Sequence, residues 1–495
     1  MAEKALNFID GVWSWPHGAK TLFSFNPADH RDVVCEAPDT PHAEVDRAVR
    51  AARAAYPAWR RTPAPERAKI IRRVGDIMAR RKMELGKLVT RECGKPLTEG
   101  LGDVQESIDM AELAAGEGRR LYGETTPSEL SNKLCFTTRE PIGVCGLITP
   151  WNFPTAIPAW KSLHALICGN TVVLKPAEDT PLCAVEFVKA LEEAGIPAGV
   201  VNLVHGQGKT AGRALSSNAG VQLMSFTGST HTGAAVATMC AESGKRVSLE
   251  CGGKNAQIVL ADANLDLAIE GALWGAFGTA GQRCTATSRL ILDESVHDEM
   301  IERLIKEAKR LKLGAGLEKG TQVGPLINER QMKRVLDYIQ AGKKDGATLR
   351  CGGARAKGRG LEHGFFVEPT IFSGVSRKMR IFREEIFGPV LSVMRVSGLT
   401  AAIETLNDCA YGLSSSIYTR DVNSALTAVR DIEAGIVYVN GPTIGAEVHL
   451  PFGGVKGSGN GHREAGKTGL DIFTEWKTVY VDYSGKLQRA QIDNS

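Results

Sequence analysis

Residues 143–174 read GVCGLITPWNFPTAIPAWKSLHALICGNTVVL, and this stretch decides the fold class. Residues 143–149 form an apolar run typical of a buried strand, residues 156–167 follow the period of a helix, and residues 171–174 form a second short strand. Strands that alternate with helices predict a parallel sheet with helices packed on it. The stretch therefore indicates an α/β protein.

The same alternation continues after this stretch and begins again in the second half of the chain. The first series adds helices at residues 184–194 and 210–216 and strands at 200–204 and 224–226. The second series follows Gly253, with strands at 255–260 and 288–292 and helices at 265–277 and 298–311. Helical periodicity also precedes the quoted stretch, at residues 44–60 and 66–92. We therefore predict two open, Rossmann-like α/β sheets.

Composition and charge narrow the class of protein. A chain of 495 residues is expected to hold more than one domain, and 43% hydrophobic with 23% charged residues is ordinary for a soluble globular protein. The net charge of +4 is too small to indicate binding to nucleic acid or to a membrane. The chain lacks both the ~20 apolar residues of a membrane span and the apolar core of a signal peptide. We therefore expect a cytoplasmic protein without a nucleic-acid or membrane partner.

Cysteines provide the first indication of chemistry. The 11 cysteines are scattered and form no Cys-x-x-Cys pair, so no zinc ribbon, disulfide framework or other metal site is expected. Cys284 lies in the small, Gly-rich stretch FGTAGQRCTA, residues 277–286. A single cysteine is more often a buried core thiol. Glu250 precedes it in LECGGK, and a thiolate with a nearby carboxylate base can form and then hydrolyse a thioester.

Seven short motifs give the chain a resemblance to a known family. They are ITPWNFP (148–154), KPAE (175–178), FTGST (226–230), LECGGK (249–254), GQRC (281–284), EEIFGP (384–389) and PFGG (451–454). In their order and spacing, over nearly the whole chain, these motifs resemble the aldehyde dehydrogenase superfamily. The resemblance implies oxidation of an aldehyde to its carboxylic acid, with NAD as the cofactor and NADP as a second option.

The resemblance also implies a role for each catalytic residue. Cys284 would attack the aldehyde carbon, and Asn152 with the Cys284 N–H would hold the oxyanion, a donor typically worth ~3 kcal/mol in the transition state. Glu250 would activate the water that hydrolyses the thioester. Lys161 and Glu475 would form a pair that carries protons away from this base. The chemistry needs a thiol of lowered pKa, which bound cofactor would favour.

The cofactor-binding residues are gathered around a Gly-rich turn. The turn GSTHTG, residues 228–233, follows a strand and opens a helix, where backbone N–H groups can bind pyrophosphate, although its spacing is not G-x-G-x-x-G. Lys175 and Glu178 would bind the adenosine ribose, and the carboxylate favours NAD because it repels a 2′-phosphate. The full set implied is Ile148, Thr149, Pro150, Trp151, Lys175, Glu178, Gly208, Phe226, Thr227, Gly228, Ser229, Gly233, Glu250, Cys251, Gly252, Glu385 and Phe387.

A narrower resemblance concerns the substrate. GTAGQRCT (278–285), VQE (104–106) and GAE (445–447) are similar to the α-aminoadipic semialdehyde dehydrogenase group, which implies substrate binding by Glu106, Arg283, Gly445 and Ala446. An arginine beside the nucleophile suits a carboxylate. AIPAWK (156–161) and CTATSR (284–289) look more like α-ketoglutaric semialdehyde dehydrogenases. A carboxylate-bearing semialdehyde is the predicted substrate. The alternatives are a broad-specificity aldehyde dehydrogenase, a CoA-acylating relative and a non-catalytic member.

The family architecture implies domain boundaries. An NAD-binding domain would hold residues 1–122 and 143–253, a catalytic domain residues 254–447, and a small β oligomerisation arm residues 123–142 and 475–495, with 448–474 as the return segment. Residues 479–483 alternate like an edge strand that can pair with another subunit. A homo-oligomer, either a dimer or a tetramer, is therefore expected.

Overall fold

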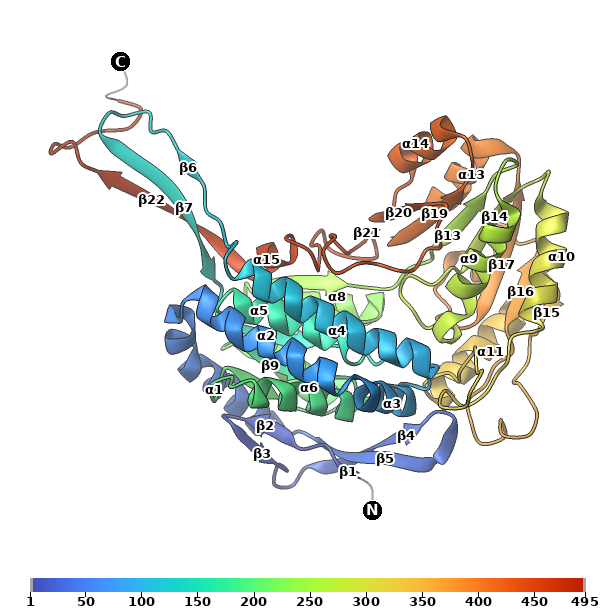
Figure 1. Ribbon diagram of the computed structural model, residues 1–495, viewed down its shortest axis with the longest axis horizontal. Helices are drawn as coiled ribbons and strands as arrows, with labels where there is room; N and C mark the ends of the chain where they lie inside the picture. The colour runs from blue at the N-terminus through green and yellow to red at the C-terminus, as the bar shows by residue number, and fades with distance from the viewer. Residues whose placement is uncertain (1–2, 493–495) are drawn as a thin grey trace.

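A computed structural model describes residues 3–492, and Figure 1 shows two α/β bodies and a projecting arm. Each body contains a seven-stranded sheet, and the arm contains a three-stranded sheet. The predicted fold class, two open α/β sheets with a small β arm, is therefore confirmed. The boundaries between the domains stay a prediction. No helix in residues 3–492 combines the length and apolar character needed to cross a membrane.

The first sheet is mostly parallel, and its central strands are buried. In spatial order its strands are β12 (Arg246–Glu250), β11 (Leu223–Thr227), β8 (Val144–Ile148), β9 (Thr171–Lys175), β10 (Val201–Leu203), β2 (Asn7–Ile9) and β3 (Val12–Ser14). Every side chain of β8 and β9 is buried, which explains why both strands are continuous apolar runs. The carboxyl ends of β8, β9, β11 and β12 bring Thr149, Lys175, Thr227 and Glu250 to one edge of the sheet, where open α/β sheets bind their ligands.

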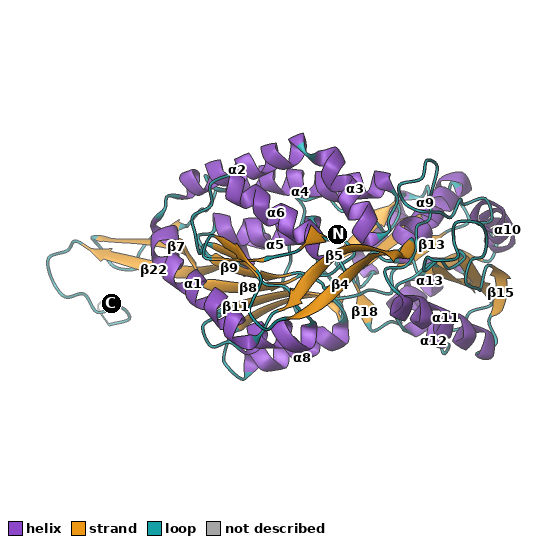
Figure 2. Ribbon diagram, turned by 90° about the horizontal axis from the view of Figure 1, so that it is seen from below, coloured by secondary structure: helices purple, strands orange, loops and turns teal. Residues whose placement is uncertain are grey.

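Helices cover both faces of this sheet, as Figure 2 shows. One face carries α1 (His42–Arg61) and α8 (Thr230–Ala241); the other carries α2 (Ala64–Arg80), α3 (Lys82–Cys93), α4 (Leu97–Glu117), α5 (Ala156–Ile167) and α6 (Pro181–Glu193). The sequence predicts one helix over residues 66–92, but the structure breaks it at Arg81, whose φ of −100° and ψ of 8° leave the helical region. Sequence analysis does not predict α4, because its three glycines weaken the local helical pattern.

The second sheet repeats the arrangement. In spatial order its strands are β15 (Thr348–Cys351), β16 (Thr370–Ser373), β17 (Val390–Val396), β14 (Arg289–Asp293), β13 (Ala256–Val259), β19 (Ser414–Tyr418) and β20 (Ile436–Val439). The predicted helix at 265–277 is α9 (Leu265–Phe277), and Asn264 caps it by accepting a hydrogen bond from the Leu267 N–H. α9 leads directly into the loop of Cys284, so this sheet positions the predicted nucleophile.

The arm is formed by β6 (Thr125–Thr126), β7 (Lys133–Pro141) and β22 (Thr474–Asp482). β22 pairs with β7 in antiparallel register from Thr474↔Pro141 to Asp482↔Lys133, and it lies at the edge of the small sheet. Trp476 and Tyr480 on β22 are 51% and 67% exposed. The predicted strand at 479–483 is therefore part of a longer edge strand, and its pairing with a second subunit stays a prediction.

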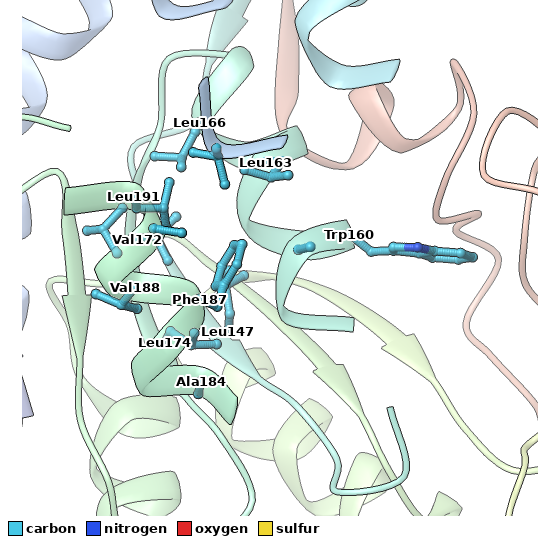
Figure 3. Packing of buried hydrophobic residues seen from close by; sticks show 14 of the residues in the cluster. Leu147, Trp160, Leu163, Leu166, Val172, Leu174, Ala184, Phe187, Val188 and Leu191 are labelled. Atoms are coloured by element: carbon cyan, nitrogen blue, oxygen red, sulfur yellow. The ribbon is translucent and has the colours of Figure 1, made fainter. Parts of the chain in front are cut away.

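The core of the first body lies between its sheet and α5 and α6, as Figure 3 shows. Phe187, Val188 and Leu191 of α6 pack in one buried cluster with Leu163 and Leu166 of α5, and none of these side chains is more than 1% exposed. Burial of an aromatic or aliphatic side chain of this size contributes ~1.5–3 kcal/mol. The cluster therefore fixes the strands whose ends carry Thr149 and Lys175.

Replacement of Phe187 by alanine should lower the melting temperature of the first unfolding transition in differential scanning calorimetry. Deletion of a fully buried phenylalanine costs ~3–5 kcal/mol, because the surrounding side chains fill the cavity only in part. Phe23→Ala is the matched control, since Phe23 is 50% exposed, and it should leave the transition nearly unchanged. Equal shifts for both variants would contradict the position of the core.

Candidate active site

Cys284 follows a turn with three consecutive residues in the left-handed region. Thr279, Ala280 and Gly281 have φ values of 50°, 52° and 69°. Such backbone is costly for residues that carry a Cβ, and it is maintained only where the surrounding structure holds it. At Gly281 an added Cβ would lie 2.3 Å from the carbonyl oxygen of Gly388. The position therefore requires glycine, and the turn packs directly against the segment before β17.

Buried amide side chains hold the rest of this loop. Gln282 Nε2 donates to the carbonyl oxygen of Pro325 at 3.3 Å, and its Oε1 accepts from the Ile327 N–H at 3.0 Å. Asn255 Nδ2 donates to the carbonyl oxygen of Cys284 at 2.8 Å. Gln282 and Asn255 therefore fix the backbone on both sides of the thiol.

Two clefts meet at Cys284. The first is lined by Pro150, Trp151, Asn152, Ile157, Thr227, Gly228, Ser229, Cys251, Gly252, Cys284, Gln331, Arg334, Glu385 and Phe387. The second is lined by Glu106, Phe153, Ile157, Trp160, Thr227, Glu250, Cys251, Arg283, Cys284, Thr285, Gly445, Ala446, Phe452 and Glu464. The structure thus gathers most predicted cofactor residues in the first cleft and all four predicted substrate residues in the second, with the thiol between them.

The environment of Cys284 keeps its sulfur protonated when no ligand is bound. Burial raises the pKa of the Cys284 thiol to about 12, and the carboxyl groups of Glu250, Glu385 and Glu106 add to the rise. The sequence led us to expect a lowered pKa, and the structure shows the opposite for the protein alone. Because the thiolate is the reactive form, activation requires a base or a positive charge close to the sulfur.

Asn152 lies beside the nucleophile loop and is 4% exposed. Its Nδ2 donates to the carbonyl oxygen of Gln282 at 3.0 Å, which leaves the second N–H of the amide available for an oxyanion. Asp103 anchors the start of the following helix, because it accepts a hydrogen bond from the Ala156 N–H at 2.7 Å. Asp103 also pairs with Lys95 at 3.0 Å, both side chains being fully buried.

Glu250 is a buried carboxyl group without a hydrogen-bond partner in the part of the chain that the structure describes. It is 3% exposed and lies at the end of β12. Burial raises the pKa of Glu250 well above its usual value, and the nearby Glu464 raises it further, whereas Lys161 lowers it. A carboxyl group with a raised pKa that faces a nucleophile is suited to general acid–base work.

The prediction that Lys161 pairs with Glu475 is wrong. Lys161 contacts the carboxylate of Glu464 and donates to Ser225 Oγ at 2.8 Å. Glu475 lies on β22, where it is 57% exposed and pairs with Arg246 at 2.5 Å. Both glutamates follow the PFGG motif, but Glu475 lies on a stretch of β22 in which both faces are exposed. Sequence reasoning missed Glu464 because a single carboxylate in a loop has no pattern of its own.

Lys175 and Glu178 lie at the carboxyl end of β9, with the nitrogen and a carboxylate oxygen 4.0 Å apart. Lys175 is buried and donates to the carbonyl oxygens of Pro176 at 2.6 Å and of Gly206 at 2.7 Å. Nearby, a groove that is separate from both clefts brings Ile148, Gly208 and Phe226 together. The same groove is also lined by Val236 and Met239 of α8.

Further predicted residues form a cradle that a bound dinucleotide would fill. Ser229 caps α8 by accepting a hydrogen bond from the Thr232 N–H, and on that helix a Cβ at Gly233 would lie 2.9 Å from Cys251 Sγ. The hydroxyls of Thr149 and Thr227 are buried without a hydrogen-bond partner among residues 3–492. Unpartnered buried polar atoms beside a helix N-terminus fit a polar, phosphate-bearing ligand.

Glu385 and Phe387 lie on the opposite wall of the first cleft. A Cβ at Gly252 would come 2.1 Å from a Glu385 oxygen, so glycine makes room for this carboxylate. Phe387 packs edge-to-face on Trp151, with 5.5 Å between ring centroids. Gln331 and Arg334 donate to the carbonyl oxygens of residues 387 and 385, each at 2.7 Å. Sequence analysis missed these two residues, because they continue the ordinary polar face of a helix, α11 (Glu329–Lys344).

Arg283 and Glu106 are two charged residues that line the second cleft. Arg283 Nε donates to Thr279 Oγ1 at 2.9 Å, and its guanidinium lies 3.4 Å from Glu99. Burial raises the pKa of Glu106 to about 8, with a further rise from Asp103. No group of three or more His, Cys, Asp or Glu side chains within residues 3–492 is placed to hold a metal ion.

Known proteins are similar to this chain in sequence and in fold. A model described as the aldehyde dehydrogenase family matches residues 13–479. The α-ketoglutaric semialdehyde dehydrogenase of Bacillus subtilis (strain 168) is 40% identical over 476 residues, covering 96% of this chain and 98% of that protein. The cytosolic aldehyde dehydrogenase 1 of Mus musculus is 43% identical over 484 residues, covering 97% and 95%. A crystal structure of a betaine aldehyde dehydrogenase point mutant from Staphylococcus aureus with NAD⁺ has a TM-score of 0.95 at 33% identity, covering 98% of both chains.

The fold and these relatives define a dinucleotide-dependent oxidoreductase. The chain belongs to the aldehyde dehydrogenase family, and it is an NAD(P)-dependent enzyme that acts on aldehydes.

Alkylation of Cys284 should report its raised pKa. In the protein without ligand, the rate with iodoacetamide should be low at pH 7 and should still increase at pH 10, because the thiol pKa is about 12. Mass spectrometry of the labelled peptide assigns the rate to Cys284, and Cys284→Ser provides the background. A rate that levels off below pH 9 would contradict the raised pKa.

Proposed function

We propose that the enzyme oxidises a carboxylate-bearing semialdehyde, with α-ketoglutaric semialdehyde as its preferred substrate, through a thioester on Cys284. This proposal rests on the position of Cys284. The residue lines both clefts, and Glu250 lines the second cleft together with it. The presence of Glu250 favours water over CoA as the acceptor of the acyl group. Together with Asn152 it also argues against a non-catalytic member, because the residues of the whole cycle are present.

The first step forms a bond between Cys284 Sγ and the aldehyde carbon. Glu250 takes the thiol proton, because its raised pKa brings the two groups closer in proton affinity. The free N–H of Asn152 and the backbone N–H of Cys284 stabilise the resulting oxyanion. The bound dinucleotide supplies the acceptor for the hydride that leaves this carbon, which brings the carbon to the thioester level.

The second step hydrolyses the thioester. After the thiol proton from the first step has left it, Glu250 removes a proton from water, the hydroxide adds to the thioester carbon, and the C–S bond breaks to release the carboxylic acid and the Cys284 thiolate. Each proton that Glu250 takes up then passes to the buried pair of Lys161 and Glu464, which are hydrogen-bonded to each other and to Ser225.

The second cleft supports an anionic substrate. Arg283 retains guanidinium N–H groups beyond its contacts with Thr279 and Glu99, and these suit a carboxylate. Because the pKa of Glu106 is about 8, this group is mostly neutral at pH 7 and does not repel the substrate. A neutral Glu106 gives no counter-ion to an ammonium group, which favours an α-keto acid over an α-amino acid. The relative from Bacillus subtilis supports the same substrate.

We further propose that β6, β7 and β22 form an arm through which copies of the chain associate. The arm projects from the first body, on the side away from the second body, and the exposed aromatic residues of its edge strand provide an apolar surface for a partner (Figure 1). The predicted boundaries, at residues 122, 143, 253 and 447, belong to this proposal.

A substrate panel followed by NADH absorbance tests the proposed reaction. We expect the highest kcat/KM with α-ketoglutaric semialdehyde, a lower value with α-aminoadipic semialdehyde, and no turnover by Cys284→Ala. Arg283→Gln should raise KM for the keto acid at least about tenfold by removing a bidentate partner, while kcat with hexanal changes less than about twofold. Equal loss for both aldehydes would show that Arg283 has only a structural role, and hexanal as the best substrate would favour broad specificity.

The pH dependence of kcat should shift in opposite directions in two variants. Glu250 acts when deprotonated, so kcat should rise with pH through its raised pKa. Lys161→Met removes a cation that lowers this pKa and should move the profile about 1 pH unit higher, whereas Glu464→Gln removes a repelling carboxylate and should move it lower. Circular dichroism confirms folding of both variants. Shifts in the same direction would contradict the proposed electrostatic coupling.

A further inference from the structure

Glu99 connects the first body to the turn that precedes Cys284 in the second body. It lies in the first turn of α4, and both of its carboxylate oxygens accept a hydrogen bond from the Thr279 N–H at 3.0 Å. Its Oε2 also accepts one from the Thr279 hydroxyl at 2.8 Å. The Glu99 side chain is only 13% exposed, and hydrogen bonds to a carboxylate are strong where water is largely excluded. One carboxylate therefore holds both polar groups that Thr279 can donate.

Thr279 needs such a contact because its backbone conformation is unfavourable. Its φ of 50° lies in the left-handed region, where a β-branched residue is an outlier, and Ala280 continues the turn with a φ of 52°. A residue with a Cβ keeps this conformation only where the surrounding structure holds it. The hydrogen bonds to Glu99 act on the backbone N–H of the strained residue itself, so they stabilise the turn at the point where it is least favourable.

The hydroxyl of Thr279 gives a reason for threonine, rather than glycine, at this position. It donates to Glu99 and accepts a hydrogen bond from Arg283 Nε at 2.9 Å. The Arg283 guanidinium also lies 3.4 Å from Glu99. Glycine would adopt the same φ without strain, but it would lose both contacts of the hydroxyl. Threonine therefore links Glu99 to Arg283, the residue directly before Cys284.

Glu99 supports the turn from outside the two clefts. It is not among the residues that line either cleft at Cys284, so a ligand in the clefts does not contact it. The start of α4 is itself fixed against the second body, because the Leu97 N–H donates to the carbonyl oxygen of Gly316 at 2.9 Å. The carboxylate of Glu99 is therefore presented to the turn from a fixed point.

We propose that Glu99 is a positioning residue for the reaction, which holds the left-handed turn at Thr279 and thereby fixes the position of Cys284 Sγ relative to the aldehyde carbon. A displacement of reacting atoms by about 1 Å can lower a rate about a hundredfold, even when the substituted residue lies away from the chemistry. This inference rests on the proposed role of Cys284 as the nucleophile and is independent of the proposed semialdehyde.

Steady-state kinetics with hexanal and NAD test the proposal, because hexanal has no carboxylate and its turnover does not report on Arg283. Glu99→Ala should lower kcat at least about tenfold and change KM for NAD less than about twofold, since the turn loses its support while the first cleft stays intact. Glu99→Gln keeps an oxygen that can accept from the Thr279 N–H and should lose much less of kcat. Glu112→Ala removes an exposed carboxylate from the same helix and should behave as wild type.

A second substitution separates this role from a general effect on folding. Thr279→Gly removes the strain of the left-handed conformation, so Glu99→Ala/Thr279→Gly should recover kcat with hexanal to within about threefold of wild type. Alkylation of Cys284 by iodoacetamide at pH 10 adds a measurement that needs no catalysis. Its rate should rise at least about threefold in Glu99→Ala, because a displaced turn exposes a thiol whose pKa is raised by burial, and it should fall again in the double variant.

An unchanged kcat in Glu99→Ala would overturn the proposal. A loss of kcat that Thr279→Gly does not restore would also overturn it, because Glu99 would then support the fold and not the turn. Turnover of hexanal by Cys284→Ala, combined with faster alkylation of Cys284 in Glu99→Ala, would contradict the proposed nucleophile and would still support the contact through which Glu99 holds the turn.

Discussion

The contact between Gly281 and the carbonyl oxygen of Gly388 is the constraint on which the active site depends. Gly281 ends the left-handed turn that presents Cys284, and Gly388 directly follows Phe387 in the segment that also carries Glu385. Because an added Cβ at residue 281 would lie 2.3 Å from that oxygen, the two segments hold one relative position. The nucleophile is thereby kept in place against one wall of the first cleft, although the two segments are far apart in sequence.

Burial sets the chemical state of the groups that this constraint brings together. Cys284, Glu250, Glu385 and Glu106 all have raised pKa values, and burial is the largest cause in each case. The site therefore carries little charge before ligands bind, and negative charge becomes favourable only when a positive group or a hydrogen-bond donor comes close. Lys161 is a positive group of this kind, because it lowers the pKa of Glu250. It thereby favours the charged form of a buried carboxyl group that has no hydrogen-bond partner among residues 3–492.

Sequence patterns predict those parts of the molecule in which local signals agree with tertiary packing. The helix at residues 265–277 was predicted with its observed ends, because its start has a capping asparagine and a glycine follows its end. The left-handed conformation of Thr279 and Ala280 has no local signal, since neither residue favours it, and packing against distant segments imposes it. The partner of Lys161 is missed for the same reason: Glu464 reaches it through the folding of a loop, whereas the family resemblance implied Glu475.

The net charge of +4 says little about the site, because the cations near it are placed individually. One cation, Arg283, lies in the second cleft, and another, Lys175, lies buried at the carboxyl end of β9. Between them, at Cys284, burial disfavours charge on the reacting groups. The carboxylate of the proposed substrate would therefore lie at Arg283, and its aldehyde carbon would lie at the sulfur. The positions of the charged residues, rather than the net charge of the chain, therefore determine where in the site an anionic group is favoured.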